Sequence, residues 1–356
     1  MIMFDLLTSL LDTVRTAMLM QLCLRPGVLL MIPATYPGPP PAEALAQTFI
    51  SDQLEKIEKS PASTKNRNLL KAAIVDAPFL LGKLNNAWAV NDAKPEQLDD
   101  LAEYYYTSIL VPVRAAGGKT PAPRSHPFRN QFDLTVTPEL EKRLSTLKAK
   151  ALVRDGYKCV VTGKVDQDHV DKVTTWTGFD LDITDAAHIM PFSLNDFEET
   201  EVPMMADETA IWTALQAFSG RSLDGLKGDG INSLQNVLTL SASVHRLFCQ
   251  LVLAFEPMEA EPNVYRILTW GKAKNRRDLS EIVTLSDHSN SGKALPNPVY
   301  LSLHAALCKV LHASGRAEEL DRILADLNEG ETPVLSHDGS TADLLEIALL
   351  RAVAVG

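Results

Sequence analysis

Cysteine is scarce in this chain of 356 residues, and its copies are far apart. The four cysteines are Cys23, Cys159, Cys249 and Cys308, and no two of them form a Cys-x-x-Cys pair. Disulfide scaffolds and zinc knuckles both use closely spaced cysteines, so neither is indicated. We therefore expect an intracellular protein, cytoplasmic or nuclear, in a reducing compartment.

Long apolar runs are absent as well. Leu and Met are frequent in residues 1–32, but Asp5, Asp12 and Arg15 interrupt them, and no small-residue cleavage site follows. This pattern argues against a signal peptide or a membrane span and favours an amphipathic helix that packs on the rest of the protein. A misassigned start codon is the alternative. With 46% hydrophobic and 22% charged residues, the composition is typical of a soluble globular protein without a membrane partner.

Positive charge is in deficit, because 34 Lys and Arg stand against 45 Asp and Glu and leave a net charge of −11. This balance argues against a strong sequence-independent affinity for nucleic acid, which depends on Lys and Arg at the phosphates. Residues 111–174 are locally positive, with 12 basic and 7 acidic residues. Residues 185–208 instead hold seven acidic residues and no Lys or Arg, and would repel a polyphosphate unless a metal neutralised them. The candidate phosphate contacts are Arg154, Lys272, Lys274, Arg276 and Arg277. The alternative is that these residues form a solvated basic surface without a ligand.

Three short motifs carry most of the chemical information. The first is Cys-Val-Val-Thr-Gly at residues 159–163, and the second is Asp-Ala-Ala-His-Ile-Met-Pro at residues 185–191. The third begins at Asn236 and reaches His245, whose apolar neighbours recur at helical spacing. His188 ends a short strand-like run that Pro191 stops, so its imidazole is expected at a strand end beside a loop. A general base there can meet substrate and solvent together.

These motifs, in this order, resemble an HNH-type nuclease domain of the ββα-metal class, and in particular its fungal branch. The resemblance covers residues 150–257. It implies an α+β fold, with a ββα-metal core of short antiparallel strands and a helix embedded in mostly helical N- and C-terminal extensions. It also implies a metal-dependent endonuclease in which His188 is the general base, Asn236 fixes the geometry of the base strand, and His245 binds the metal.

The chain departs from this family pattern at three positions. Ala187 stands where relatives carry a metal-binding Asp or His, and Asp185, one pleat away on the same face, is the substitute ligand or else a solvent-facing carboxylate. Cys249 follows His245 by one helical turn, where relatives carry Asp, Asn or His, and it is either a ligand for a soft metal or a packing residue. Thr162 replaces the second cysteine of a zinc pair, so we expect Cys159 to be a core residue. The metal therefore stays open among Mg, Mn, Ni and Zn.

Two other functions remain compatible with these departures. The same scaffold can serve as a small-molecule biosynthetic enzyme in which His188 acts as acid and base on an organic substrate. It can also be a catalytically silent interaction module. The corresponding partners are DNA for the nuclease and a small molecule for the other enzyme.

The chain divides into three expected regions. Residues 1–137 form a helical N-terminal region with Pro- and Gly-rich loops, residues 138–285 the HNH-like domain, and residues 286–356 a helical region that packs on the core. His304 and His312 lie on one predicted helix and are expected to be packing residues. Helices are predicted over residues 42–59, 66–75, 94–109, 138–154, 208–218, 241–250, 299–314, 317–327 and 341–355. Strands are predicted over residues 157–162, 179–188, 237–240, 251–255 and 264–270.

Overall fold

The computed structural model describes residues 42–116, 138–173, 178, 180–195, 208–258 and 261–328. The helices predicted over residues 1–32 and 341–355 lie outside these ranges, as do residues 196–207 of the acidic run. Helices and short strands are combined as expected for an α+β protein. Within the described ranges, no helix has the length and apolar character needed to cross a bilayer.

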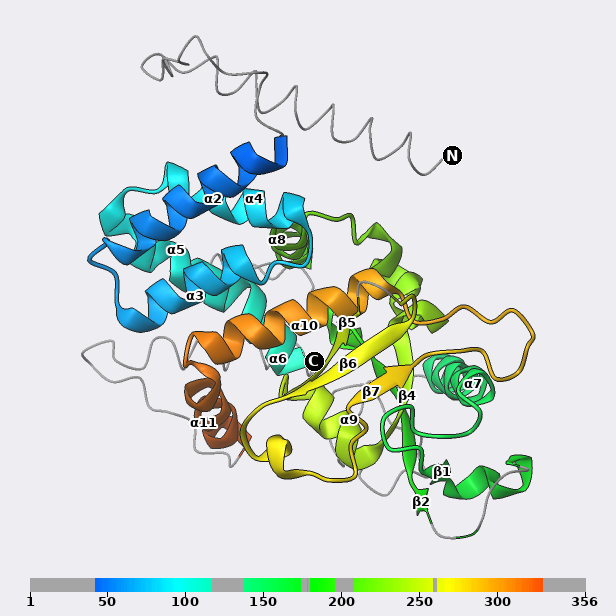
Figure 1. Cartoon of the computed structure of the whole chain (residues 1–356). Coiled ribbons are helices and arrows are strands. Elements are labelled where there is room, and N and C mark those ends of the chain that lie inside the picture. Colours follow the sequence, from blue (N-terminus) through cyan, green and yellow to red (C-terminus); the bar gives the residue numbers. More distant parts are fainter. Residues whose placement is uncertain are drawn as a thin grey trace.

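A group of helices forms the N-terminal part of the structure (Figure 1). These helices are α2 Ala42–Glu58, α3 Thr64–Val75, α4 Leu80–Asp92, η1 Pro95–Gln97, α5 Leu98–Tyr105, η2 Tyr106–Leu110 and α6 Val111–Ala116. The predicted helices over residues 42–59, 66–75 and 94–109 are confirmed. Helix α4 was missed because its N-cap residue is Phe79, which makes no side-chain capping hydrogen bond, so the sequence holds no start signal for it.

The strand pair at the centre of the motif region is antiparallel. Strand β3 Thr184–His188 pairs with β4 Val237–Ser241, and His188 lies opposite Val237. Helix α9 Ala242–Cys249 follows β4 directly, so the expected order of two short antiparallel strands and a helix is confirmed. Ser241 stands at the cap position of α9, but its hydroxyl makes no capping hydrogen bond.

Two helices cover opposite faces of this strand pair. Side chains alternate along a strand, so Ala187, Leu238 and Leu240 point to one face, where they join the same apolar cluster as Val244 and Phe248 of α9. Ala186 and Val237 point to the other face and pack on Leu147 and Ala151 of α7 Pro138–Arg154. Asp185 therefore lies on the face of α9, as its two-residue spacing from Ala187 predicts.

The strand predicted over residues 157–162 is wrong. Gly156, Tyr157 and Gly163 all have positive φ, and the Gly163 amide donates to the Cys159 carbonyl at 2.9 Å, so the chain forms a tight turn. Its apolar residues face inward, and Cys159 is buried as expected. Their burial, and not strand pairing, explains the apolar pattern. The next elements are β1 Val165–Asp166, η3 Gln167–Lys172 and β2 Leu181–Asp182, and β1 and β2 pair in parallel.

One helix and several short helical turns lie between β3 and β4, and a second sheet follows α9. The connection holds η4 Phe192–Asn195, α8 Glu208–Ser219, η5 Asp224–Leu226, η6 Gly228–Asn232 and η7 Leu234–Asn236. The second sheet is antiparallel, in the order β5 Leu253–Pro257, β6 Val264–Thr269 and β7 Ile282–Thr284, with η8 Gly271–Asn275 between the last two strands. Strand β7 was not predicted, since its three residues are too few to show a period.

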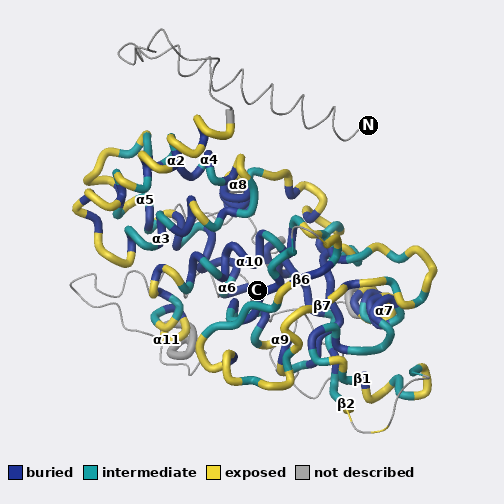
Figure 2. Tube along the Cα trace, viewed as in Figure 1, coloured by how far each residue is buried: buried dark blue, intermediate teal, exposed yellow. Residues whose placement is uncertain are grey.

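The C-terminal helices join these parts into one body. Helix α10 Pro298–Ala313 crosses over β5 and also packs on α3, and α11 Ala317–Asn328 follows it (Figure 1). One cluster of buried apolar side chains includes residues from Ala46 to Leu320. Figure 2 shows buried segments in the N-terminal helices, the motif region and α10. The helical N- and C-terminal parts are thus packed on the motif region through a shared core.

Two glycines let the N-terminal helices reach the inserted helix α8. A Cβ atom at Gly82 of α4 would overlap the backbone oxygens of Phe218 and Ser219, and one at Gly220 would overlap the backbone of Gly82. We expect Gly82→Ala to lower the free energy of unfolding by about 1–3 kcal/mol or more, because backbone cannot move aside as a side chain can. Lys83→Ala, on the same helix, is the control. Equal denaturation midpoints for the two variants would show that this close approach is unimportant.

His304 provides a pH-dependent contribution to stability. It is buried, stacks on Phe248 with ring centroids 3.9 Å apart, and its Nε2 lies 3.2 Å from the Phe248 carbonyl oxygen. Burial lowers the pKa of His304 to about 3, and the bond to that carbonyl only partly opposes the shift. In the unfolded chain, the His304 side chain has its ordinary pKa near 6.5. The native state therefore loses stability as the pH falls from about 6.5 towards 3, by about 1.4 kcal/mol per pH unit from this group.

A phenylalanine variant isolates this contribution. His304→Phe keeps the aromatic stack but cannot bind a proton. If its free energy of unfolding is lower than that of the parent protein at pH 7, this difference should shrink steadily as the pH falls. Urea denaturation at several pH values between 7 and 5 measures this difference. Parallel stability curves for the two proteins would contradict the shifted pKa.

Candidate active site

His188 lies at the end of β3 and is 4% exposed. Its Nε2 is 3.0 Å from the Oδ1 atom of Asn232, in η6, and the ring of Phe192 lies 5.9 Å away between centroids. Burial lowers the pKa of His188 to about 4; the bond to Asn232 opposes this shift, and the nearby His245 adds to it. The imidazole is therefore neutral at neutral pH, which is the form that a general base requires.

Asn236 is fully buried behind the end of β3. Its Oδ1 accepts the amide of Met190 at 2.9 Å, and its Nδ2 donates to the carbonyl oxygens of Met190 and Ile231, each at 3.0 Å. Its own carbonyl accepts the amide of Ile189 at 2.8 Å. One side chain thus joins the chain just after His188 to the turn that carries Asn232.

His245 lies on α9, close enough to His188 for the two rings to influence each other electrostatically. Its Nδ1 is 3.1 Å from Oδ2 of Asp185, and its Nε2 is buried without a hydrogen-bond partner in the described part of the chain. Burial favours the neutral ring, but interactions with Cys249 and with the Asp185 carboxylate outweigh it and raise the pKa of His245 to about 10. The carboxylate orients the imidazole ring through Nδ1, so Nε2 is the ring atom that is left for a further interaction.

This donor set fits a metal ion held by few protein atoms. A ligating histidine commonly donates its other ring N–H to a carboxylate, as His245 does to Asp185, and a buried Nε2 without a partner is suited to a metal. Cys249 follows one helical turn later and would add a soft donor. Across the described ranges, no three His, Cys, Asp or Glu side chains form a group that could hold a metal by themselves. Any remaining positions would fall to water or to substrate.

Arg154 does not lie on a phosphate-binding surface. It is fully buried, and its Nε and Nη2 atoms donate to the two carboxylate oxygens of Asp155 at 2.7 and 2.8 Å. The same guanidinium donates to the carbonyl oxygens of Leu234 and Val237, at 2.7 and 2.8 Å. The prediction from local positive charge was wrong at this residue, because the last turn of α7 points Arg154 into the core.

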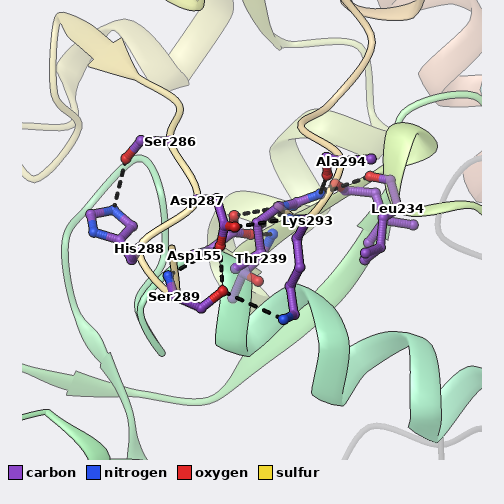
Figure 3. A network of polar contacts seen from close by, with 11 residues as sticks. Asp155, Leu234, Thr239, Ser286, Asp287, His288, Ser289, Lys293 and Ala294 are labelled. Atoms are coloured by element: carbon purple, nitrogen blue, oxygen red, sulfur yellow. Dashed lines mark hydrogen bonds and ion pairs between the residues drawn. The ribbon is translucent and has the colours of Figure 1, made fainter. Parts of the chain in front are cut away.

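The Arg154–Asp155 pair holds the open edge of β4. Oδ2 of Asp155 accepts the amide of Thr239 at 2.9 Å, and the Thr239 carbonyl accepts the amide of Val160 at 3.0 Å, so side chains and the turn after α7 together take the place of a neighbouring strand. Figure 3 shows Asp155 and Thr239 beside the loop that begins at Asp287. In that loop, hydrogen bonds from the Ser289 hydroxyl and from three backbone amides lower the pKa of Asp287 to about 2, and the His288 amide donates to the Arg154 carbonyl at 2.8 Å.

The other predicted basic residues lie around η8. Lys272, Lys274 and Arg277 are exposed. Arg276 is half-buried, forms an ion pair with Asp278, and donates from Nη1 to the Ser243 hydroxyl at 3.2 Å. Because Ser243 lies in the first turn of α9, this basic cluster borders the helix that carries His245.

No sequence pattern indicated Asn232 as a site residue. It lies in a Gly- and Asp-rich turn, and no motif includes it. The only usable signal was its position four residues before Asn236, which is too weak to predict a contact with His188.

No curated protein and no solved structure matches this chain. A family model described as HNH endonuclease matches residues 159–256, the segment that holds His188, Asn236 and His245. The match supports an HNH-type nuclease domain in this part of the chain.

Proposed function

We propose that the protein is a metal-dependent HNH-type endonuclease that hydrolyses phosphodiester bonds. One observation supports this function above all: a neutral strand-end histidine and a carboxylate-oriented helix histidine come together inside the segment that matches the HNH endonuclease model. The strand pair and α9 would be its ββα-metal core. DNA is the expected substrate.

Each residue has a separate task in this proposal. His188 takes a proton from the attacking water, and Asn236 holds the strand end that presents it. His245 would hold a divalent ion through Nε2, with Asp185 orienting its ring and Cys249 as a second donor. When bound, the ion would supply charge stabilisation at the phosphoryl group and the departing oxygen.

The basic cluster at η8 would contact the DNA backbone. Lys272, Lys274 and Arg277 are exposed beside α9, and Arg276 is held against the first turn of that helix. Phosphates bound there would lie on the side of the domain that carries His245. Arg154 takes no part in this surface.

A small-molecule enzyme is the second candidate, and the burial of His188 favours it. A side chain with 4% exposure is more readily reached by a small organic substrate than by a nucleic-acid duplex. Acid–base chemistry by His188 would not need a complete metal site. The two candidates differ in their need for His245: the nuclease requires it for activity, and the small-molecule enzyme does not.

His245→Ala is expected to lose bound metal and phosphodiester cleavage together, because Nε2 is a buried nitrogen with no hydrogen-bond partner among the described residues. Elemental analysis and calorimetric titration with Mg²⁺, Mn²⁺, Ni²⁺ and Zn²⁺ measure the loss. His288→Ala removes an exposed histidine elsewhere and should keep the parent metal content. Undiminished metal binding by His245→Ala would contradict the assignment of this ligand.

The proposed domain boundaries, family branch and cellular location accompany this function. We propose residues 138–285 as the HNH-like unit, with helical regions on both sides, and a place in the fungal branch of the family. Cys159, Cys249 and Cys308 are free thiols, in keeping with the proposed intracellular location.

A further inference from the structure

Asn232 contacts the proposed general base directly. Its Oδ1 atom lies 3.0 Å from Nε2 of His188, within hydrogen-bond distance. An amide oxygen only accepts hydrogen bonds, so the proton of this bond must come from the imidazole. His188 is therefore protonated at Nε2, and its lone pair is at Nδ1.

The turn that carries Asn232 is held in place from two sides. Asn236 donates to the carbonyl of Ile231, the residue before Asn232, and bonds to both polar backbone atoms of Met190, two residues after His188. In the same turn, a Cβ atom at Gly230 would overlap the carbonyl oxygen of Gly225. The distance between Asn232 and His188 is therefore set by the fold.

We propose that Asn232 is a positioning residue that keeps His188 in the Nε2–H tautomer and so makes Nδ1 the atom that accepts the proton. The role of Nδ1 rests on the proposed hydrolysis. A water molecule gives a proton to Nδ1 and its oxygen bonds to phosphorus. The bond from phosphorus to the leaving oxygen then breaks, and that oxygen takes a proton from solvent.

Two substitutions separate this role from simple packing. Asn232→Ala removes the acceptor, while Asn232→Asp keeps an acceptor oxygen and removes the amide donor. Asn91→Ala, which removes a surface amide at the end of α4, is the control. The full-length proteins are compared by nitrogen-15 NMR of the imidazole rings, with the His188 signals assigned by their loss in His188→Ala.

The parent protein and Asn232→Asp should show a single His188 tautomer with the proton on Nε2, and Asn232→Ala should show a mixture. If plasmid DNA is cleaved, Asn232→Ala should lower kcat by about 10- to 100-fold with little change in KM, and Asn232→Asp should recover most of this loss. The control should match the parent in both measurements.

The outcomes distinguish this proposal from the function on which it rests. A proton on Nδ1 in the parent, or an unchanged Nε2–H tautomer in Asn232→Ala, overturns the role of Asn232 whether or not DNA is cleaved. The expected tautomers in a protein that cleaves no phosphodiester would uphold the positioning of His188 and refute the nuclease.

Discussion

Replacing His188 by alanine is expected to slow phosphodiester cleavage by roughly 10²- to 10⁴-fold, because the attacking water then loses its proton acceptor. The metal content should stay nearly unchanged, since the contact between His245 and Asp185 does not involve His188 and is kept. Circular dichroism, elemental analysis and plasmid cleavage, measured on the same preparation, test all parts of this expectation.

The matched control is His288→Ala, which removes an exposed imidazole from the loop after β7. It should cleave DNA at the parent rate. Cleavage by His188→Ala at the parent rate would show that this histidine is not the base. Loss of metal in His188→Ala would show that its role is not confined to proton transfer.

Arg154→Ala is expected to lower the free energy of unfolding by about 3–5 kcal/mol, because it leaves the buried Asp155 carboxylate without its cation. The carbonyl oxygens of Leu234 and Val237 lose their donor at the same time. Because Val237 begins β4, the strand opposite His188 should be loosened first. Urea denaturation, with hydrogen exchange at the amides of β4, measures both effects.

Arg143→Ala is the control for this substitution. Arg143 lies on the same helix and forms an exposed ion pair with Asp229 at 2.7 Å, so its loss should cost less than about 1 kcal/mol. A stable Arg154→Ala protein with weakened DNA binding would contradict the buried role and restore Arg154 as a phosphate contact.

The elements around His188 and His245 were predictable because each is encoded locally. A short apolar run stopped by Pro191 predicts the strand end, and apolar residues at helical spacing predict α9. The alternation of side chains along a strand placed Asp185 on the face of Ala187, which the pairing with β4 confirms.

Other features depend on contacts that sequence spacing does not reveal. Arg154 has the sequence context of a surface cation, and only the path of α7 against β4 buries it. The turn at residues 157–162 follows from three positive φ angles, although the apolar residues in this segment predicted a strand. Asn232 reaches His188 because Asn236 holds two distant backbone segments together, which no local pattern encodes.

Cleavage of supercoiled plasmid by the parent protein, His188→Ala and His245→Ala tests the central claim most directly. The three proteins are compared side by side in Mg²⁺, Mn²⁺, Ni²⁺ and Zn²⁺, with elemental analysis of each preparation. The proposed function predicts metal-dependent nicking by the parent, strong loss of rate with metal retained in His188→Ala, and loss of both in His245→Ala. No cleavage by the parent in any of these metals, or equal cleavage by all three proteins, would contradict it.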